Sequence, residues 1–300
     1  MADQAVRRPR NPHRAESWQP TALRRVQVRS VEPLTPELVR VTLEGDELGE
    51  FTTATGSAGA TASATAGDTG LLPAVRSPSF DDVVVFCLPD PDTGEVTLPV
   101  PAPGGGLGHP LGGAALVREY TVRSLRDDAL CVDLVHHASG AGVRWLESVR
   151  PGDDLTIVGP RVSRALPAVD RMLAVGDATA LPALARLIEE RPPTLALDVL
   201  AAVPDPSALP RSAIPARTVL PAVSPADADA DRVRVRVVAA APGSADELID
   251  ALAAAELPTG FAWVAGESGM VTTVRRHLLA RGQEPDRVQF TGYWRLGGPL

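Results

Sequence analysis

The residues best suited to chemistry lie at positions 118–123, which read Arg-Glu-Tyr-Thr-Val-Arg after a loop rich in proline and glycine. Alternation along a strand places Arg118, Tyr120 and Val122 on one face. An arginine fork suits a diphosphate, a tyrosine packs against a flat ring, and Thr121 with the strand backbone can hydrogen-bond a ring nitrogen. These groups predict a flavin dinucleotide site. An ordinary strand with one exposed arginine and one core tyrosine has the same pattern.

A second candidate is the Gly140–Gly142 turn, which leads into an expected helix over Val143–Val149 that contains Trp145. The free N–H groups at a helix N-terminus attract anions. This turn would therefore take the other end of a diphosphate. A plain turn explains the same glycines.

Two further candidates lie where expected strands end and helices begin, at Val175–Pro182 and Ala265–Ser268. In open α/β sheets, ligands bind at the carboxyl ends of strands. Asp177 would repel a phosphate, so we expect it to cap the helix or to meet a ribose or amide group, and Thr179 is the better phosphate or nicotinamide contact. Glu267 offers a polar contact to a cofactor. Both acidic residues also suit ordinary helix caps.

A fifth candidate is the aromatic pair Tyr293 and Trp294, which precedes Arg295. The pair is unusual in a chain with only 4% aromatic residues. It either covers a bound flavin or fixes this end of the chain.

The composition excludes several kinds of site. The net charge of -8 argues against a nucleic-acid binder, which usually has a basic face. The sequence has no lysine, so a P-loop lysine and a Schiff-base lysine are excluded. The histidines lack metal-ligand spacing and no complete GxSxG motif is present, so neither a metal site nor a hydrolase is predicted.

The cysteines and the N-terminal sequence bear on location. Cys87 and Cys131 lie in apolar, strand-like runs and are expected to be buried thiols in a reducing cytosol, although a disulfide between them stays open. Residues 1–14 are rich in arginine without an apolar core, unlike a secretory signal. No apolar run approaches the roughly 18 residues that cross a bilayer. We expect a cytoplasmic protein without a membrane partner.

Residues 21–167 are expected to form an antiparallel barrel of about six short strands. Residues 1–20, which are polar with three prolines, are expected to be a disordered arm. Residues 52–79, which are mostly Ala, Thr, Gly and Ser, are expected to be a disordered insertion. The predicted strands are 25–30, 38–43, 83–88, 95–98, 118–123, 130–136 and 155–158.

Residues 168–300 are expected to form a parallel α/β domain, because strand-like and helix-like runs alternate. The predicted strands are 172–175, 195–203, 233–238, 261–265 and 288–291. The predicted helices are 177–190, 246–255 and 268–281.

Six motifs in order resemble those of one family. They are R-x-Y-T-x-R, V-D-L-V-H-H with its glycine turn and tryptophan, P-G-D-x-L-x-I-x-G-P-R, G-D-x-T-A-L-P-A, A-G-E and G-Y-W-R. Together they resemble the siderophore-interacting proteins, which are FAD-containing ferric-siderophore reductases of the ferredoxin–NADP reductase superfamily. The resemblance runs from about residue 22 to 298, interrupted by the 52–79 insertion.

This resemblance implies a six-stranded Greek-key FAD-binding barrel followed by an NAD(P)H-binding domain. It implies that electrons pass from NAD(P)H through flavin to Fe(III) held by a siderophore, with ferredoxin as another donor, in a monomer. Ferrous iron binds oxygen-rich siderophores less tightly, so reduction releases the metal.

The resemblance also assigns roles to residues. Tyr120 and Thr121 are the implied catalytic pair, with Thr121 near flavin N5. The implied FAD-holding set is Arg118, Tyr120, Thr121, Val122, Arg123, His136, Gly140, Gly142 and Trp145. The implied nicotinamide site is Gly176, Asp177, Thr179, Gly266 and Glu267.

The chain departs from the family pattern at three positions. Val83 and Val85 stand where many members have a histidine and a lysine that helps bind anionic siderophores. Val143 stands where members often have a serine or threonine. Arg161 and Arg295 remain as substrate contacts. These departures keep two alternatives open, a flavin reductase for another acceptor or partner oxygenase, and a siderophore-binding protein without catalysis.

Overall fold

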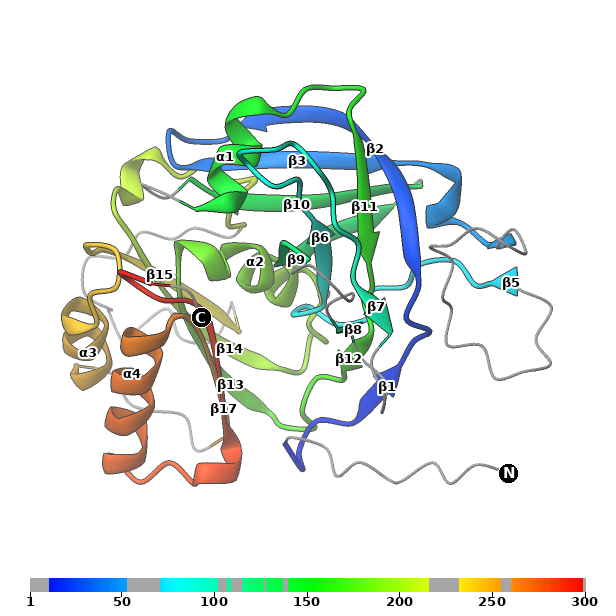
Figure 1. Ribbon diagram of the computed structural model, residues 1–300. Coiled ribbons are helices and arrows are strands. Elements are labelled where there is room, and N and C mark those ends of the chain that lie inside the picture. The colour runs from blue at the N-terminus through cyan, green and yellow to red at the C-terminus, as the bar shows by residue number, and fades with distance from the viewer. Residues whose placement is uncertain are drawn as a thin grey trace. The chain divides into compact units, whose positions relative to one another are not determined.

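The computed structural model describes residues 11–52, 71–101, 107–108, 115–126, 128–136, 140–215, 232–254 and 260–298. The chain divides into two units, one formed by Ser17–Ser163 and the other by Arg164–Leu300 with Met1–Glu16. The first is built on a closed antiparallel barrel and the second on a five-stranded parallel sheet (Figure 1). The predicted fold class is confirmed.

Six strands close the barrel, and every neighbouring pair is antiparallel. In spatial order they are β10 (Ala129–Val135), β3 (Leu38–Glu44), β2 (Leu23–Pro33), β11 (Asp154–Val158), β6 (Val83–Cys87) and β9 (Val117–Arg126), which pairs back with β10. Strand β2 alternates between buried apolar and more exposed residues, as the sequence pattern predicts, whereas β6 is buried on both faces from Val84 to Cys87.

The barrel interior is one apolar cluster of inward-pointing side chains. Helix α1 (Ala141–Ser148) adds Trp145 and Leu146 to this cluster. The strands contribute Val26, Val28, Val41, Leu43, Val84, Phe86, Val122, Leu130, Val132, Leu134, Leu155 and Ile157. Burial of this surface is the main stabilising term for the unit.

The barrel unit carries further short elements. The 3-10 helix η1 spans Asp46–Leu48. The short strand pairs are β1 (Glu16–Trp18) with β12 (Val162–Arg164), β4 (Phe51–Thr52) with β5 (Leu71–Leu72), and β7 (Val100–Pro101) with β8 (Leu107–Gly108).

The second unit has the strand order β15-β14-β13-β16-β17, and all four pairings are parallel. The strands are β13 (Arg171–Asp177), β14 (Ala196–Val203), β15 (Val233–Ala239), β16 (Phe261–Glu267) and β17 (Val288–Trp294). After β13 the chain adds β14 and β15 on one side of β13, and then adds β16 on its other side. The carboxyl ends of β13 and β16 therefore form a topological switch point, where such sheets bind ligands.

Helices cover the parallel sheet. Helices α3 (Asp246–Ala253) and α4 (Ser268–Ala280) lie side by side and bury their apolar stripes in one cluster with the sheet (Figure 1). Helix α2 (Leu181–Glu190) packs on β13 and β14, and its first seven residues are all buried. The 3-10 helices are η2 (Ala178–Ala180), η3 (Pro206–Ala208) and η5 (Pro285–Arg287). None of the helices in the described ranges is long and apolar enough to cross a membrane.

The predicted disordered arm is wrong for residues 11–20, which are ordered around one buried side chain. Arg14 is only 1% exposed. Its guanidinium donates hydrogen bonds to the Ala165 carbonyl at 2.8 Å, the Arg164 carbonyl at 2.6 Å and Gln289 Oε1 at 3.1 Å. A polar segment can thus be fixed by hydrogen bonds to distant partners, which composition does not reveal.

The predicted disordered insertion is wrong for its last residues, 71–79. Val75 is buried against the barrel core, and its N–H donates to the Leu48 carbonyl at 2.8 Å. Residues 53–70 lie outside the described residues.

The predicted strand at 95–98 is also absent. These residues follow a turn in which the Asp90 N–H donates to the Glu95 carbonyl at 2.8 Å. The turn takes the backbone out of strand pairing until β7 begins at Val100.

Candidate functional site

Tyr120 of β9 points into the barrel and lies against the start of α1. Its ring meets Phe86 edge-on at a centroid distance of 4.9 Å, and Phe86 meets Trp145 at 5.5 Å. Burial raises the pKa of Tyr120 to about 12, with the Arg118 charge opposing the shift. A Cβ on Gly142 would lie 2.2 Å from Tyr120 Oη. The tyrosine and the glycine are therefore fitted to each other.

The other residues of the 118–123 motif have different environments. Val122 is fully buried in the barrel core, and its N–H donates to the Asp82 carbonyl at 2.9 Å. Thr121 and Arg123 lie on the outer face of β9 and are buried. Arg118 is exposed, with its guanidinium donating to the Val117 carbonyl at 2.7 Å. Side-chain contact with a cofactor is thus ruled out for Val122.

Among the residues that the structure describes, no side chain covers the N-terminus of α1. Gly140 has φ +133°, with no described atom within 4 Å of a Cβ placed there and no described side chain capping the helix by a hydrogen bond. His136 follows β10, with its Nε2 3.6 Å from Glu147 Oε1. Uncapped helix N–H groups and the exposed Arg118 fork suit a dianionic diphosphate. The residues of the barrel therefore fit the predicted dinucleotide, whereas Trp145 is a core residue.

A buried carboxyl lies at the start of β6, next to the motif strand. Asp82 is 1% exposed, and its Oδ2 accepts hydrogen bonds from Ser79 N at 2.9 Å and Ser77 Oγ at 3.1 Å. Burial raises the pKa of Asp82, and these hydrogen bonds oppose the shift only in part. Nothing in the sequence distinguishes this buried carboxyl from that of Asp81, which is only partly buried.

Asp177 ends β13 and joins three parts of the second unit. Its Oδ1 accepts from Thr179 N at 2.8 Å and Thr179 Oγ1 at 2.5 Å. Its Oδ2 accepts from Glu267 N and from Trp294 Nε1, both at 2.8 Å. Four donors occupy the lone pairs of this carboxylate. Asp177 therefore caps the start of the helix, which is one of its two expected roles, and it links β13 to Glu267 and Trp294. No lone pair of the carboxylate is left for a ligand.

The same contacts change the expectation for Thr179. Both of its donors, the N–H and the hydroxyl, are directed to Asp177. The hydroxyl oxygen can still accept a hydrogen bond, which suits a nicotinamide amide and does not suit a phosphate.

Glu267 ends β16 and holds the chain beyond β17. Its Oε2 accepts from Met270 N at 2.8 Å, which caps α4, and its Oε1 accepts from Leu296 N at 3.2 Å. Ser268 Oγ donates to the Trp294 carbonyl at 3.0 Å. The segment 294–296 is thus fixed at the carboxyl ends of β13 and β16.

Three glycines allow this close packing. A Cβ on Gly266 would lie 2.6 Å from Asp177 Oδ2, and one on Gly292 would lie 2.5 Å from Ser268 Oγ. A Cβ on Gly176 would lie 2.4 Å from the Cβ of Ala180. Internal packing therefore explains Gly176 and Gly266 without a ligand.

The two arginines predicted to contact substrate lie in different parts of the chain, one after β11 and one after β17. Arg161 lies partly buried after the cis peptide between Gly159 and Pro160, and its carbonyl accepts from Gln19 N at 2.8 Å. Arg295 is exposed in the segment that follows β17. Neither side chain is joined to the other predicted site residues by a described contact.

Val85, which stands where the family often has its lysine, is covered. It is 3% exposed and packs with Cys87 and Val158 in a small apolar cluster outside the barrel core. Burial raises the pKa of the Cys87 thiol to about 11, and both cysteines are free. This position offers apolar contact and no charge.

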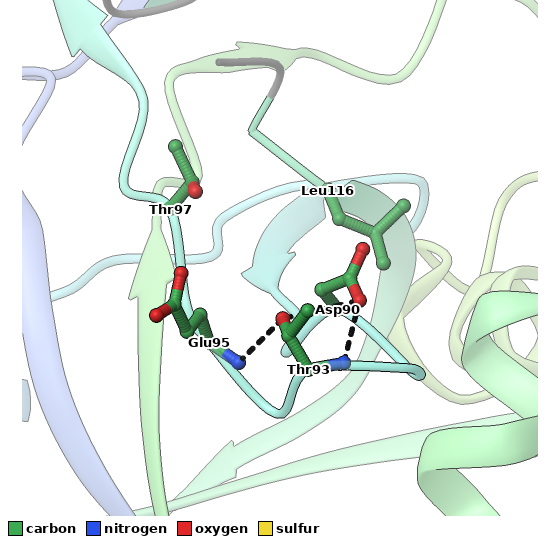
Figure 2. Close-up of a pocket in the computed structure, with 5 residues that line it drawn as sticks. All are labelled: Asp90, Thr93, Glu95, Thr97 and Leu116. Atoms are coloured by element: carbon green, nitrogen blue, oxygen red, sulfur yellow. Dashed lines mark hydrogen bonds between the residues drawn. The ribbon is translucent and has the colours of Figure 1, made fainter. Parts of the chain in front are cut away.

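A depression on the barrel unit includes Leu116, the residue before β9. Figure 2 shows its lining, which is Asp90, Thr93, Glu95, Thr97 and Leu116. Asp90 Oδ1 already accepts from Asp92 N, Thr93 N and Thr93 Oγ1. The cavity volume of about 250 Å³ is below the roughly 300–1,000 Å³ typical of ligand pockets. In the part of the chain that the structure describes, no cluster of His, Cys, Asp and Glu could hold a metal ion.

For Trp294 the sequence left two roles open, covering a bound flavin or fixing this end of the chain, and its hydrogen bond to Asp177 agrees with the second. The partner of its indole is 117 residues away in the sequence. An aromatic pair near an acidic strand end was the only signal, and it did not distinguish a cofactor contact from a structural one.

Comparison with known proteins identifies the family. Residues 68–164 match the model of the siderophore-interacting FAD-binding domain, and residues 169–297 match that of the siderophore-interacting protein. The NADPH-dependent ferric-chelate reductase of Escherichia coli (strain K12) is 30% identical over 292 residues, covering 95% of this chain and 97% of that protein.

Solved structures agree in fold. A siderophore utilization protein from T. fusca has a TM-score of 0.72 at 31% identity, covering 96% of this chain and 98% of its own. The siderophore-interacting protein SipS from Aeromonas hydrophila has a TM-score of 0.65 at 23% identity, covering 93% of each chain, and shows the shared fold. The chain therefore belongs to the siderophore-interacting protein family, with FAD as the cofactor of its barrel.

Proposed function

We propose that this protein passes electrons from NAD(P)H to ferric iron held by a siderophore. The observation that carries the proposal is the Escherichia coli relative, which aligns with nearly the whole chain and is named for that activity. In this proposal residues 21–167 hold FAD and residues 168–300 hold NAD(P)H. One NAD(P)H gives two electrons and reduces two ferric ions, and a proton is released.

The barrel residues hold and orient the flavin cofactor. FAD, when bound, accepts a hydride and releases electrons one at a time. Arg118, His136 and the open N-terminus of α1 bind the diphosphate. Tyr120 fixes the position of α1 through its fit to Gly142. Thr121 and Arg123 lie on the outer face of β9, where they would hydrogen-bond a nitrogen of the flavin ring.

The sheet residues orient the nicotinamide nucleotide. The switch point at the ends of β13 and β16 is where open α/β sheets bind such ligands. Thr179 accepts from the carboxamide, because its own donors are taken by Asp177. Glu267 closes the edge by holding Leu296.

The iron substrate is a ferric chelate without strong negative charge. The buried Val85 supplies no charge where a lysine would attract an anionic chelate, and the chain carries a net charge of -8. A neutral hydroxamate complex suits these features better than an anionic catecholate complex. Arg161 and Arg295 supply the remaining cationic contacts.

Two further parts of the proposal concern the donor and the compartment. NAD(P)H is the donor, and reduced ferredoxin is the alternative to test beside it. The protein works in a reducing cytoplasm, where its two free thiols remain stable.

Steady-state assays test this function. Purified protein is supplied with NADPH, NADH or reduced ferredoxin, and Fe(II) is trapped by a chromophoric chelator. We expect ferric hydroxamates to be reduced with a higher kcat/KM than ferric catecholates. The proposal is wrong if no ferric chelate is reduced above the rate without protein.

A second candidate function is reduction of another acceptor, such as a partner oxygenase or a quinone. The apolar, covered Val85 favours it, because the usual cation for an anionic siderophore is missing. Assays with ferricyanide and a quinone in place of the ferric chelate distinguish the two functions. Rapid turnover with these acceptors alone would support the second.

A further inference from the structure

We propose that Asp177 is a positioning residue for Trp294, and that the indole ring of Trp294 contacts the nicotinamide ring of NAD(P)H. This inference rests on the proposed function, because it assumes that the second unit binds the nucleotide. It concerns only residues of that unit.

Asp177 determines where the indole lies. The Trp294 Nε1–H donates to Asp177 Oδ2 at 2.8 Å, and the same oxygen accepts from Glu267 N at 2.8 Å. Asp177 is only 8% exposed, so the carboxylate is itself fixed. A hydrogen bond to a buried, ionisable acceptor gives the ring one orientation.

The backbone around Trp294 is fixed as well. Trp294 pairs with Glu267 at a register shift in the β16–β17 ladder, and its carbonyl accepts from Ser268 Oγ at 3.0 Å. The next anchor is Leu296, whose N–H donates to Glu267 Oε1 at 3.2 Å. The segment is thus bound on both sides of the ring.

The position of the ring suits a nicotinamide contact. Trp294 is half-buried, so the residue reaches the surface in part. It lies at the carboxyl ends of β13 and β16, the switch point at which these sheets bind ligands. Flat aromatic rings stack on one another at small entropic cost. A fixed indole at this edge therefore offers a stacking surface. The Asp177 carboxylate cannot bind the nucleotide itself, because four protein donors already occupy its lone pairs.

The test compares three variants in the FAD-loaded protein. Trp294→Phe keeps a ring and removes the N–H donor, Trp294→Leu removes the ring, and Asp177→Asn alters the acceptor. Trp18→Phe is the control for tryptophan loss, because Trp18 is 54% exposed and lies in the barrel unit. The dissociation constants of NADP⁺ and NAD⁺ are measured by fluorescence titration, together with FAD content and the melting temperature.

The expected pattern separates positioning from stability. Trp294→Phe should weaken binding of the preferred nucleotide about threefold to tenfold and Trp294→Leu more, with FAD content unchanged. Asp177→Asn combined with Trp294→Phe should weaken binding by less than the sum of the two single effects, because Asp177 acts on the nucleotide through the indole N–H that Trp294→Phe removes. If Asp177→Asn fails to fold, the two Trp294 variants decide the question. The control should bind as the parent protein does.

Contrary results are distinguishable. If the parent protein binds nucleotide and reduces ferric chelates while Trp294→Leu binds nucleotide equally well, the inference is wrong and the proposed function stands. If the parent protein binds neither nucleotide, both fail.

Discussion

At the scale of single residues, the structure contains two pairs of side chain and glycine that are fitted to each other. Tyr120 and Gly142 are one pair, and Asp177 and Gly266 are another. In each, the glycine leaves space for a polar atom that a Cβ would displace. The first pair joins β9 to α1, and the second joins β13 to β16.

Gly142→Ala should destabilise the barrel and reduce its FAD content, because the new Cβ would lie 2.2 Å from Tyr120 Oη. Adding Tyr120→Phe removes that oxygen and leaves the nearest ring carbon at 3.5 Å, which is an ordinary contact. The double variant should therefore recover most of a loss of about 1–3 kcal/mol. Urea unfolding and bound flavin are the measurements.

Gly298→Ala is the control for that experiment, since no atom of the described residues would lie within 4 Å of its Cβ. The fit between Tyr120 and Gly142 is contradicted if Gly142→Ala matches this control. It is also contradicted if Tyr120→Phe worsens the loss.

Asp82 should make the stability of the protein depend on pH. Its pKa is raised by burial, so the folded state holds the proton to higher pH than the unfolded state does. Stability is therefore lost as pH rises from the unfolded carboxyl pKa, about 3.9, through the folded value. The Asp82→Asn variant has no carboxyl to ionise, so it should not lose stability in this way as pH rises. It keeps an oxygen acceptor for Ser79 and Ser77. Urea unfolding at several pH values should show the parent protein weakening relative to the variant; parallel curves would refute the assignment.

At the scale of elements, periodicity predicts regular structure and misses segments fixed by single polar contacts. The alternation of Val39, Val41 and Leu43 predicts β3, because a strand has one buried face. The spacing of Leu181, Leu184 and Ile188 predicts the helix that became α2. Residues 11–20 have no such pattern, yet the buried Arg14 orders them.

Arg14→Met tests how that segment is held. The variant keeps a long apolar stem and removes three hydrogen bonds to Ala165, Arg164 and Gln289. We expect a loss of about 2–4 kcal/mol in unfolding free energy, because buried acceptors lose charged donors. We also expect faster proteolysis within residues 11–18.

Arg25→Met is the matched control, because the Arg25 side chain is 87% exposed and its ion pair with Glu47 is at the surface. It should change stability by less than about 0.5 kcal/mol. Equal losses in the two variants would show that Arg14 does not hold the segment.

The candidate site was predictable only in part, and the reason lies in sequence separation. The types of Tyr120, Thr121 and Asp177 indicate their chemistry. The contacts that assign their roles come from the fold, as when Trp294 meets Asp177 across 117 positions. Trp145 shows the opposite error, because a tryptophan after a glycine turn suggested a cofactor contact and proved to be core.

At the scale of the whole molecule, the chain combines a barrel that fits a dinucleotide with a parallel sheet that has a nucleotide-type switch point. The family models match the two parts separately, at residues 68–164 and 169–297. A single chain can thus hold a two-electron donor, NAD(P)H, and a flavin cofactor that passes electrons on one at a time. The proposed transfer of electrons to ferric iron requires both.

The visible spectrum of the purified protein, followed through anaerobic addition of NAD(P)H and then of a ferric hydroxamate, tests this account most directly. The account predicts flavin absorbance, bleaching by NADPH or NADH, and recovery of absorbance on adding the chelate, with two Fe(II) trapped per nucleotide oxidised. A protein without flavin would contradict it. A bleached flavin that the ferric chelate reoxidises no faster than buffer alone would contradict it as well.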